Sequence, residues 1–163
     1  MSLAEHIKVS LELPTYIVNH YLEDLTDENL LVRPAEKMNH IAWQLGHLIS
    51  SEHFHITEVF PDSMPVIPDG FKEQYSIETA TSENPADFLT KAEYLQLMQQ
   101  QRQGTLNVLS ELSDQQLMEA SPETVRYLGP TVGSVFAGES THWMMHAGQW
   151  AVVRRKLGKP PLF

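Results

Sequence analysis

The chain has 163 residues, of which 42% are hydrophobic, and it contains no cysteine. That length is enough to bury one core, so we expect a single domain over residues 1–163. The absence of thiols excludes disulfides, thiolate zinc sites, iron–sulfur ligation and a cysteine nucleophile, so any tight metal site must use histidine and carboxylate ligands. The net charge of −10 would repel a phosphate backbone and argues against nucleic acid as a partner.

The sequence also argues against a membrane protein. It has no run of about 18 apolar residues, and its first residues form neither a basic start nor an apolar signal core. We therefore expect a cytoplasmic protein with no membrane partner. The few basic residues that gather at 154–159 are expected to complement the negative end of the last helix rather than to bind a polyanion.

The first helix is expected from Ser2, as its N-cap, to about Glu23, because apolar residues recur at helical spacing. Pro14 lies inside this helix and should kink it, since proline lacks a backbone donor. Thr26 is placed to cap one further helical turn before the next proline breaks it.

A second helix is expected from about Asn39 to just before Pro61, because apolar residues cover a wide face of it. Residues 61–84 contain several prolines and are expected to form a long loop, which is either the wall or lid of a site or a mobile connector. Phe71 and Tyr75 are its candidates for covering the mouth of a site.

A third helix is expected to begin at Asn84-Pro85, a capping side chain followed by proline at the first helical position, and to continue to about Leu109. After a short helical turn and a loop, a fourth helix is expected over 131–157, where Gly158 and two prolines end it. Four long helical segments without a convincing strand predict an all-α four-helix bundle.

Three polar residues, Glu139, His142 and His146, interrupt the apolar stripe by which the fourth helix faces the bundle interior. Burying a polar side chain without a partner costs roughly 1–3 kcal/mol, so these three residues require an explanation. Two histidines at i and i+4 lie about 6 Å apart along a helix and about 40° apart around it, which lets both imidazoles bind one ion. Metal coordination explains the pair if a third ligand comes from elsewhere.

His47 on the second helix is the natural third ligand, because it lies within the apolar face of an element expected to pack beside the fourth helix. His40 lies at the start of the same helix. His53 and His55 lie near its acidic, proline-terminated end, where we expect them to be solvated. From periodicity alone, the favoured interpretation of His47 is an ordinary core histidine that is hydrogen-bonded without metal.

Two parts of the chain resemble a known family. Residues 33–48, which contain Trp-x-x-x-His, look like the start of the second helix of the DinB-like (YfiT-like) metalloenzymes. Residues 131–134, 142–149 and 156–161 are similar to that family's last helix and its end, and they contain His-x-x-x-His-x-Gly-Gln. The combined pattern is much more specific than either half.

The resemblance implies that His47, His142 and His146 bind a divalent metal ion, with zinc or nickel expected, inside an up-down-down-up four-helix bundle that forms a homodimer. It implies metal-assisted hydrolysis or thiol transfer on a small molecule, with metal-bound water or a low-molecular-weight thiol at an open coordination position. Glu139 is a candidate acceptor for an imidazole N–H or a candidate general base, and a solvated carboxylate is the alternative. The chain departs from the family at Ala147, where many members have arginine.

Two other classes of function fit the sequence. One is a metal-binding or ligand-binding bundle without enzymatic activity, because no full set of catalytic side chains is visible beside the three histidines. The other is a structural or interaction bundle without metal. Gln149 is likewise open to two interpretations, since it can orient a ligand or join two helices by a polar contact.

Overall fold

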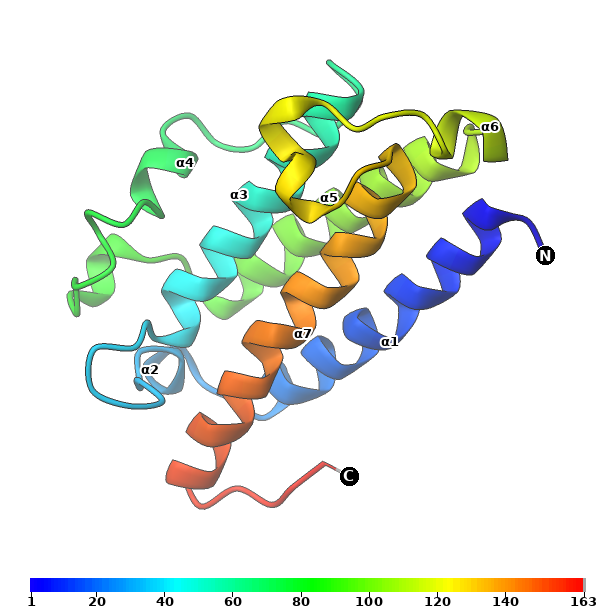
Figure 1. Cartoon of the computed structure of the whole chain (residues 1–163). Helices are drawn as coiled ribbons and strands as arrows, with labels where there is room; N and C mark the ends of the chain where they lie inside the picture. The colour runs from blue at the N-terminus through cyan, green and yellow to red at the C-terminus, as the bar shows by residue number, and fades with distance from the viewer. Residues whose placement is uncertain (163) are drawn as a thin grey trace.

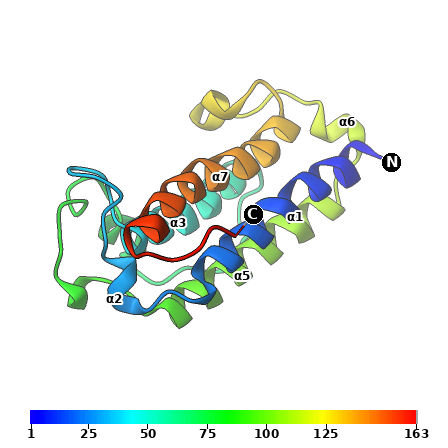
Figure 2. The same cartoon turned by 90° about the horizontal axis from the view of Figure 1, so that it is seen from below.

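The computed structural model describes residues 1–162, in which the four long helices are α1 (Leu3–Glu23), α3 (Ile41–Val59), α5 (Lys91–Ser110) and α7 (Val132–Lys156). Helices α1 and α7 run in one direction and α3 and α5 in the other, which is the up-down-down-up order (Figure 1). Figure 2 shows the pair α3 and α7 lying over the pair α1 and α5. No strand occurs within residues 1–162, so the prediction of an all-α fold is confirmed.

Short helical segments connect the long helices. They are α2 (Asp27–Leu30), α4 (Phe71–Gln74), α6 (Asp114–Leu117) and the two 3₁₀ segments η1 (Pro85–Asp87) and η2 (Glu123–Leu128). Segment η2 packs against both α3 and α7, so it lies close to the helices that carry the predicted site. Among the helices of the described residues, none is long and apolar enough to cross a membrane.

Capping side chains set the helix starts. Ser2 and Thr26 cap α1 and α2, as the sequence predicted. Each side chain accepts a hydrogen bond from the backbone N–H three residues later, and the side chain of that residue accepts one from the backbone N–H of the cap. The predicted start of the third helix is wrong. Asn84 caps only the single turn η1, the backbone becomes extended at Phe88, and α5 begins at Lys91 because the Thr90 side chain caps it.

Helix α1 continues without a break through Pro14. Proline at this position cannot donate to the carbonyl oxygen of Ser10, four residues earlier, which would leave that oxygen without its helical partner. The hydroxyl of Ser140 on α7 donates to this oxygen at 2.7 Å. The neighbouring helix therefore supplies the donor that proline lacks.

Residues 61–84 form the long loop that the sequence predicted, with one short helix within it. They include α4, whose Phe71 is 2% exposed, and the adjoining Tyr75, which is 3% exposed, and both belong to the hydrophobic core. The ring of Tyr75 lies so close to Gly46 on α3 that a Cβ there would come within 2.2 Å of it. These two aromatic residues therefore fix the segment to α3 rather than cover the mouth of a site.

Candidate metal centre

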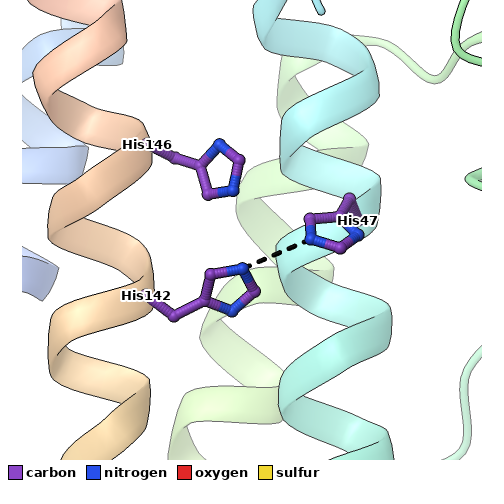
Figure 3. Close-up of side chains that lie close together, drawn as sticks. All are labelled: His47, His142 and His146. Carbon is purple, nitrogen blue, oxygen red and sulfur yellow. Dashed lines mark hydrogen bonds between the residues drawn. The ribbon is translucent and has the colours of Figure 1, made fainter.

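The three predicted histidines come together between α3 and α7. Ligand atoms from His47, His142 and His146 all lie within 4.8 Å of one another. The Nε2 atoms of His47 and His142 are 3.3 Å apart, and Figure 3 shows His142 and His146 projecting from one helix toward His47 on the other. The antiparallel pairing of α3 and α7 thus joins residues that are far apart in the sequence.

Neighbouring side chains hold the first of these imidazoles in place. The ring of Trp43, one turn before His47 on α3, stacks on the His47 ring with an angle of 10° between the planes and 5.1 Å between the centroids. The indole Nε1–H of Trp43 donates to the carbonyl oxygen of Ser76 and to the hydroxyl of Thr79, each at 3.2 Å. The segment between α3 and α5 therefore helps to fix the orientation of His47.

Gln44 determines which nitrogen of His146 faces the site. Its Oε1 accepts hydrogen bonds from the indole N–H of Trp150 at 2.8 Å and from Nδ1 of His146 at 3.0 Å. Because Gln44 Nε2 donates to the backbone oxygen of Asn39 and to Oε1 of Gln149, the amide cannot be turned around. The Nδ1 atom of His146 therefore carries the proton, and its Nε2 keeps a free lone pair.

The environment keeps all three imidazoles neutral at ordinary pH. Burial, with a contribution from the nearby histidines, lowers the pKa of His142 to about 3. Burial and the neighbouring His47 lower the pKa of His146 to about 4. The pKa of His47 is also lowered, mainly by burial. Neutral imidazole is the form that binds metals, so the lone pairs are available without the loss of a proton.

A divalent ion fits this set of donors. Two nitrogens bound to a tetrahedral zinc ion at about 2.0–2.1 Å are about 3.3 Å apart, which matches the separation of the two Nε2 atoms of His47 and His142. Nδ1 of His142 is buried and has no hydrogen-bond partner among the described residues, so no protein contact fixes this ring as Gln44 fixes His146. Three imidazoles without a thiolate suit zinc, nickel or a similar borderline ion.

The expectation that His55 is solvated is wrong. Its side chain is almost fully buried, and its Nδ1 lies 2.5 Å from Oε1 of Glu139. A signal was present in the sequence, because His47 and His55 are separated by eight residues and therefore lie on the same side of α3. His53, by contrast, is half-buried and hydrogen-bonds Gln101 on α5, away from the three histidines.

Glu139 is completely buried, so it is not the solvated carboxylate that was one interpretation of the sequence. It is an acceptor for an imidazole, but for His55 rather than for one of the three clustered histidines. Burial raises the pKa of Glu139, and the hydrogen bond from His55 opposes that shift. The other polar residue of uncertain role, Gln149, joins α7 to Gln44 on α3.

A pocket of about 520 Å³ adjoins the cluster. It is lined by His47, Ser51, His55, Tyr127, Leu128, Gly138, Thr141, His142 and Met145. These described lining residues include no lysine or arginine, and they combine hydroxyl groups with apolar side chains. The pocket therefore suits a small, partly apolar molecule rather than a phosphate.

A second cavity, of about 660 Å³, lies between α1 and α5 and reaches Trp143. None of the described residues that line it is a histidine. Its one cationic side chain, Arg102, already forms a buried ion pair with Glu52 at 3.2 Å. We therefore assign the chemistry of the protein to the smaller pocket beside His47.

The fold and the site together define a class of protein, the DinB-like helical bundles. The sequence model of the DinB superfamily matches residues 14–150, which include all three clustered histidines, and the chain belongs to that superfamily. The searches of curated proteins and of solved structures returned no match. The predicted family is therefore confirmed, whereas the family match does not identify a substrate.

Proposed function

We propose that this protein is a metal-dependent enzyme that acts on a small molecule by metal-assisted hydrolysis or by thiol transfer. The observation that carries the proposal is the convergence of three neutral imidazoles from two helices, two of which, His47 and His142, line an open pocket. A structural metal site is closed by protein ligands on all sides, whereas a catalytic site keeps a coordination position open toward its substrate.

In this proposal His47, His142 and His146 hold the ion, and Gln44 and Trp43 fix the direction of two of their rings. The ion supplies Lewis-acid chemistry, which activates a small molecule in the pocket. Apolar contact with Leu128 and Met145 would orient the substrate and exclude water around it.

The first test is the metal content of protein purified without a metal-affinity tag. We expect about one equivalent of a divalent ion per chain in the wild type and its loss in His47→Ala, because two remaining imidazoles bind too weakly. His53→Ala is the matched control, since it removes a histidine from the same helix outside the cluster. Equal metal content in all three proteins would contradict the proposal.

The second test separates an enzyme from a bundle that only binds metal or ligand. We expect turnover with at least one member of a panel of small thiols, esters and amides, and we expect a chelator to abolish it and added metal to restore it. Stoichiometric metal without turnover on any of these substrate classes would favour the non-enzymatic alternative.

A further inference from the structure

A chain of three hydrogen-bonded side chains leads from the interior of the bundle to the pocket. Glu139 on α7 contacts Nδ1 of His55 on α3, and Nε2 of His55 lies 2.5 Å from the hydroxyl of Tyr127 in η2. Glu139 is 0% exposed and His55 is 3% exposed, whereas Tyr127 is 72% exposed. The chain therefore begins in a fully desolvated carboxylate and ends in an accessible phenol.

The order of donors along this chain follows from its buried end. With Glu139 as a carboxylate, Nδ1–H of His55 donates to it, which leaves Nε2 as an acceptor for the hydroxyl of Tyr127. The phenol oxygen then has its lone pairs available, and no other hydrogen bond to it is present within residues 1–162. Tyr127 is thus prepared to accept a hydrogen bond from a ligand.

The accessible end of the chain lies in the pocket beside the three-histidine cluster. Tyr127 and His55 line it together with His47 and His142, and the ring centroids of His55 and His142 are 6.3 Å apart. The three-residue chain comes from α3, α7 and η2, which all pack against one another. A molecule that reaches His47 and His142 through this pocket therefore passes the side chain of Tyr127.

We propose that Tyr127 is a substrate-contacting residue, whose oxygen accepts a hydrogen bond from the S–H or O–H group of a small nucleophile in the metal pocket. His55 and Glu139 are positioning residues that hold the phenol in the required direction. This inference rests on the proposed metal-dependent function, because it assigns a nucleophile to the same site. The class of ligand is a small protic nucleophile, either a thiol or water.

The test uses the cobalt-loaded protein and 2-mercaptoethanol as the probe. Binding is followed by the charge-transfer absorption of the thiolate on cobalt, which forms with release of the S–H proton to solvent. The hydroxyl group of the bound 2-mercaptoethanol is then the O–H donor to Tyr127. We expect Tyr127→Phe to raise the dissociation constant of the thiol about tenfold, the effect of one lost hydrogen bond, with the affinity for cobalt unchanged. Tyr16→Phe, an exposed tyrosine on α1, is the matched control and should behave as the wild type.

Variants at His55 test the positioning role. Glutamine can place an acceptor near the position of Nε2, so His55→Gln should keep the thiol affinity within about threefold of the wild type, whereas His55→Ala should lose it as Tyr127→Phe does. All measurements are made with cobalt at saturation. If His55 had a purely structural role, His55→Gln would not restore the thiol affinity that the absorption measures.

The outcomes separate this inference from the proposal on which it rests. If the wild type fails to bind cobalt, the metal-dependent function is wrong and the role of Tyr127 falls with it. If the wild type binds cobalt and thiol but Tyr127→Phe has the same thiol affinity, only the role of Tyr127 is overturned. Because Tyr127 is largely exposed, its substitution should leave folding intact, which a thermal melt verifies.

Discussion

Gln44 shows how one neutral side chain can set the tautomer of a neighbouring histidine. Two of its four hydrogen bonds are to groups of fixed role, the indole donor of Trp150 and the backbone carbonyl of Asn39, and these set its direction toward the imidazole of His146 and the amide of Gln149. A residue with fewer partners could rotate and would allow His146 to turn either nitrogen toward the site. The tautomer of His146 is therefore a property of the packing between α3 and α7.

We expect Gln44→Leu to lower the affinity for the metal by about 10- to 100-fold, because outer hydrogen-bond partners of ligands typically contribute that much. The N–H groups of His146 and Trp150 would also lose their acceptor, at a cost of roughly 1–3 kcal/mol in stability for each buried donor. Competition with a chromophoric chelator measures the affinity, and Gln100→Leu on the exposed face of α5 is the control. An unchanged affinity in Gln44→Leu would show that another contact sets the tautomer.

The sequence predicted the convergence of His47, His142 and His146, because helical periodicity places all three on core-facing stripes. Their role as metal ligands stays a prediction. Tyr127 could not be found in this way, since its position depends on how the connection between α5 and α7 folds over α3. A segment without hydrophobic periodicity does not indicate in its sequence which helix it packs against.

Helices α1 and α7 lie side by side, and a side chain of α7 completes the hydrogen bonding of the α1 backbone. The hydroxyl of Ser140 replaces the amide that Pro14 lacks, so the proline is tolerated in the interior of a continuous helix. Proline inside a helix otherwise costs about 3 kcal/mol or more. Because Ser140 must lie opposite the carbonyl of Ser10, this hydrogen bond favours one alignment of α7 along α1.

We expect Ser140→Ala to lower the free energy of unfolding by about 1 kcal/mol, since the carbonyl of Ser10 loses its donor. In a Pro14→Ala background the same substitution should cost much less, because the amide of residue 14 then serves that carbonyl. Urea unfolding of the four proteins gives the coupling energy. A coupling of zero would mean that the hydroxyl does not substitute for the missing amide.

The starts of α1, α2 and α7 could be predicted from Ser2, Thr26 and Thr131, because the capping signal is local. The start of α5 could not, because two capping sites compete within a few residues and both are used, Asn84 for η1 and Thr90 for α5. The order of residues 61–84 also escaped prediction, since it depends on the distant contact of Tyr75 with Gly46.

The stability of the metal-free bundle should depend on pH through its buried histidines. The pKa values of His142 and His146 in the folded protein, about 3 and about 4, lie below the ordinary value of 6.5 that applies to the unfolded chain. Below pH 6.5 the unfolded chain therefore binds protons that the folded protein does not. The stability is fully present above that pH and is lost as the pH falls toward 4.

We expect the melting temperature in the presence of a chelator to fall steadily between pH 7 and pH 4. The double variant His142→Gln/His146→Gln should show a smaller fall, because each titrating site contributes at most about 1.4 kcal/mol per pH unit. Thermal unfolding followed by circular dichroism provides the measurement. Identical slopes in the two proteins would show that these histidines do not govern the acid sensitivity.

Because α3 and α5 run in the same direction, the chain between them must return along the full length of the bundle (Figure 1). A helix of 19 residues is about 28 Å long, a distance that about nine extended residues can span. The connection, residues 60–90, is more than three times as long. Within this connection the backbone oxygen of Ser76 accepts a hydrogen bond from Trp43, whose ring stacks on the ring of His47. Insertions or deletions in this return segment would therefore change the tilt of the His47 imidazole from outside the pocket, with the helix order unchanged.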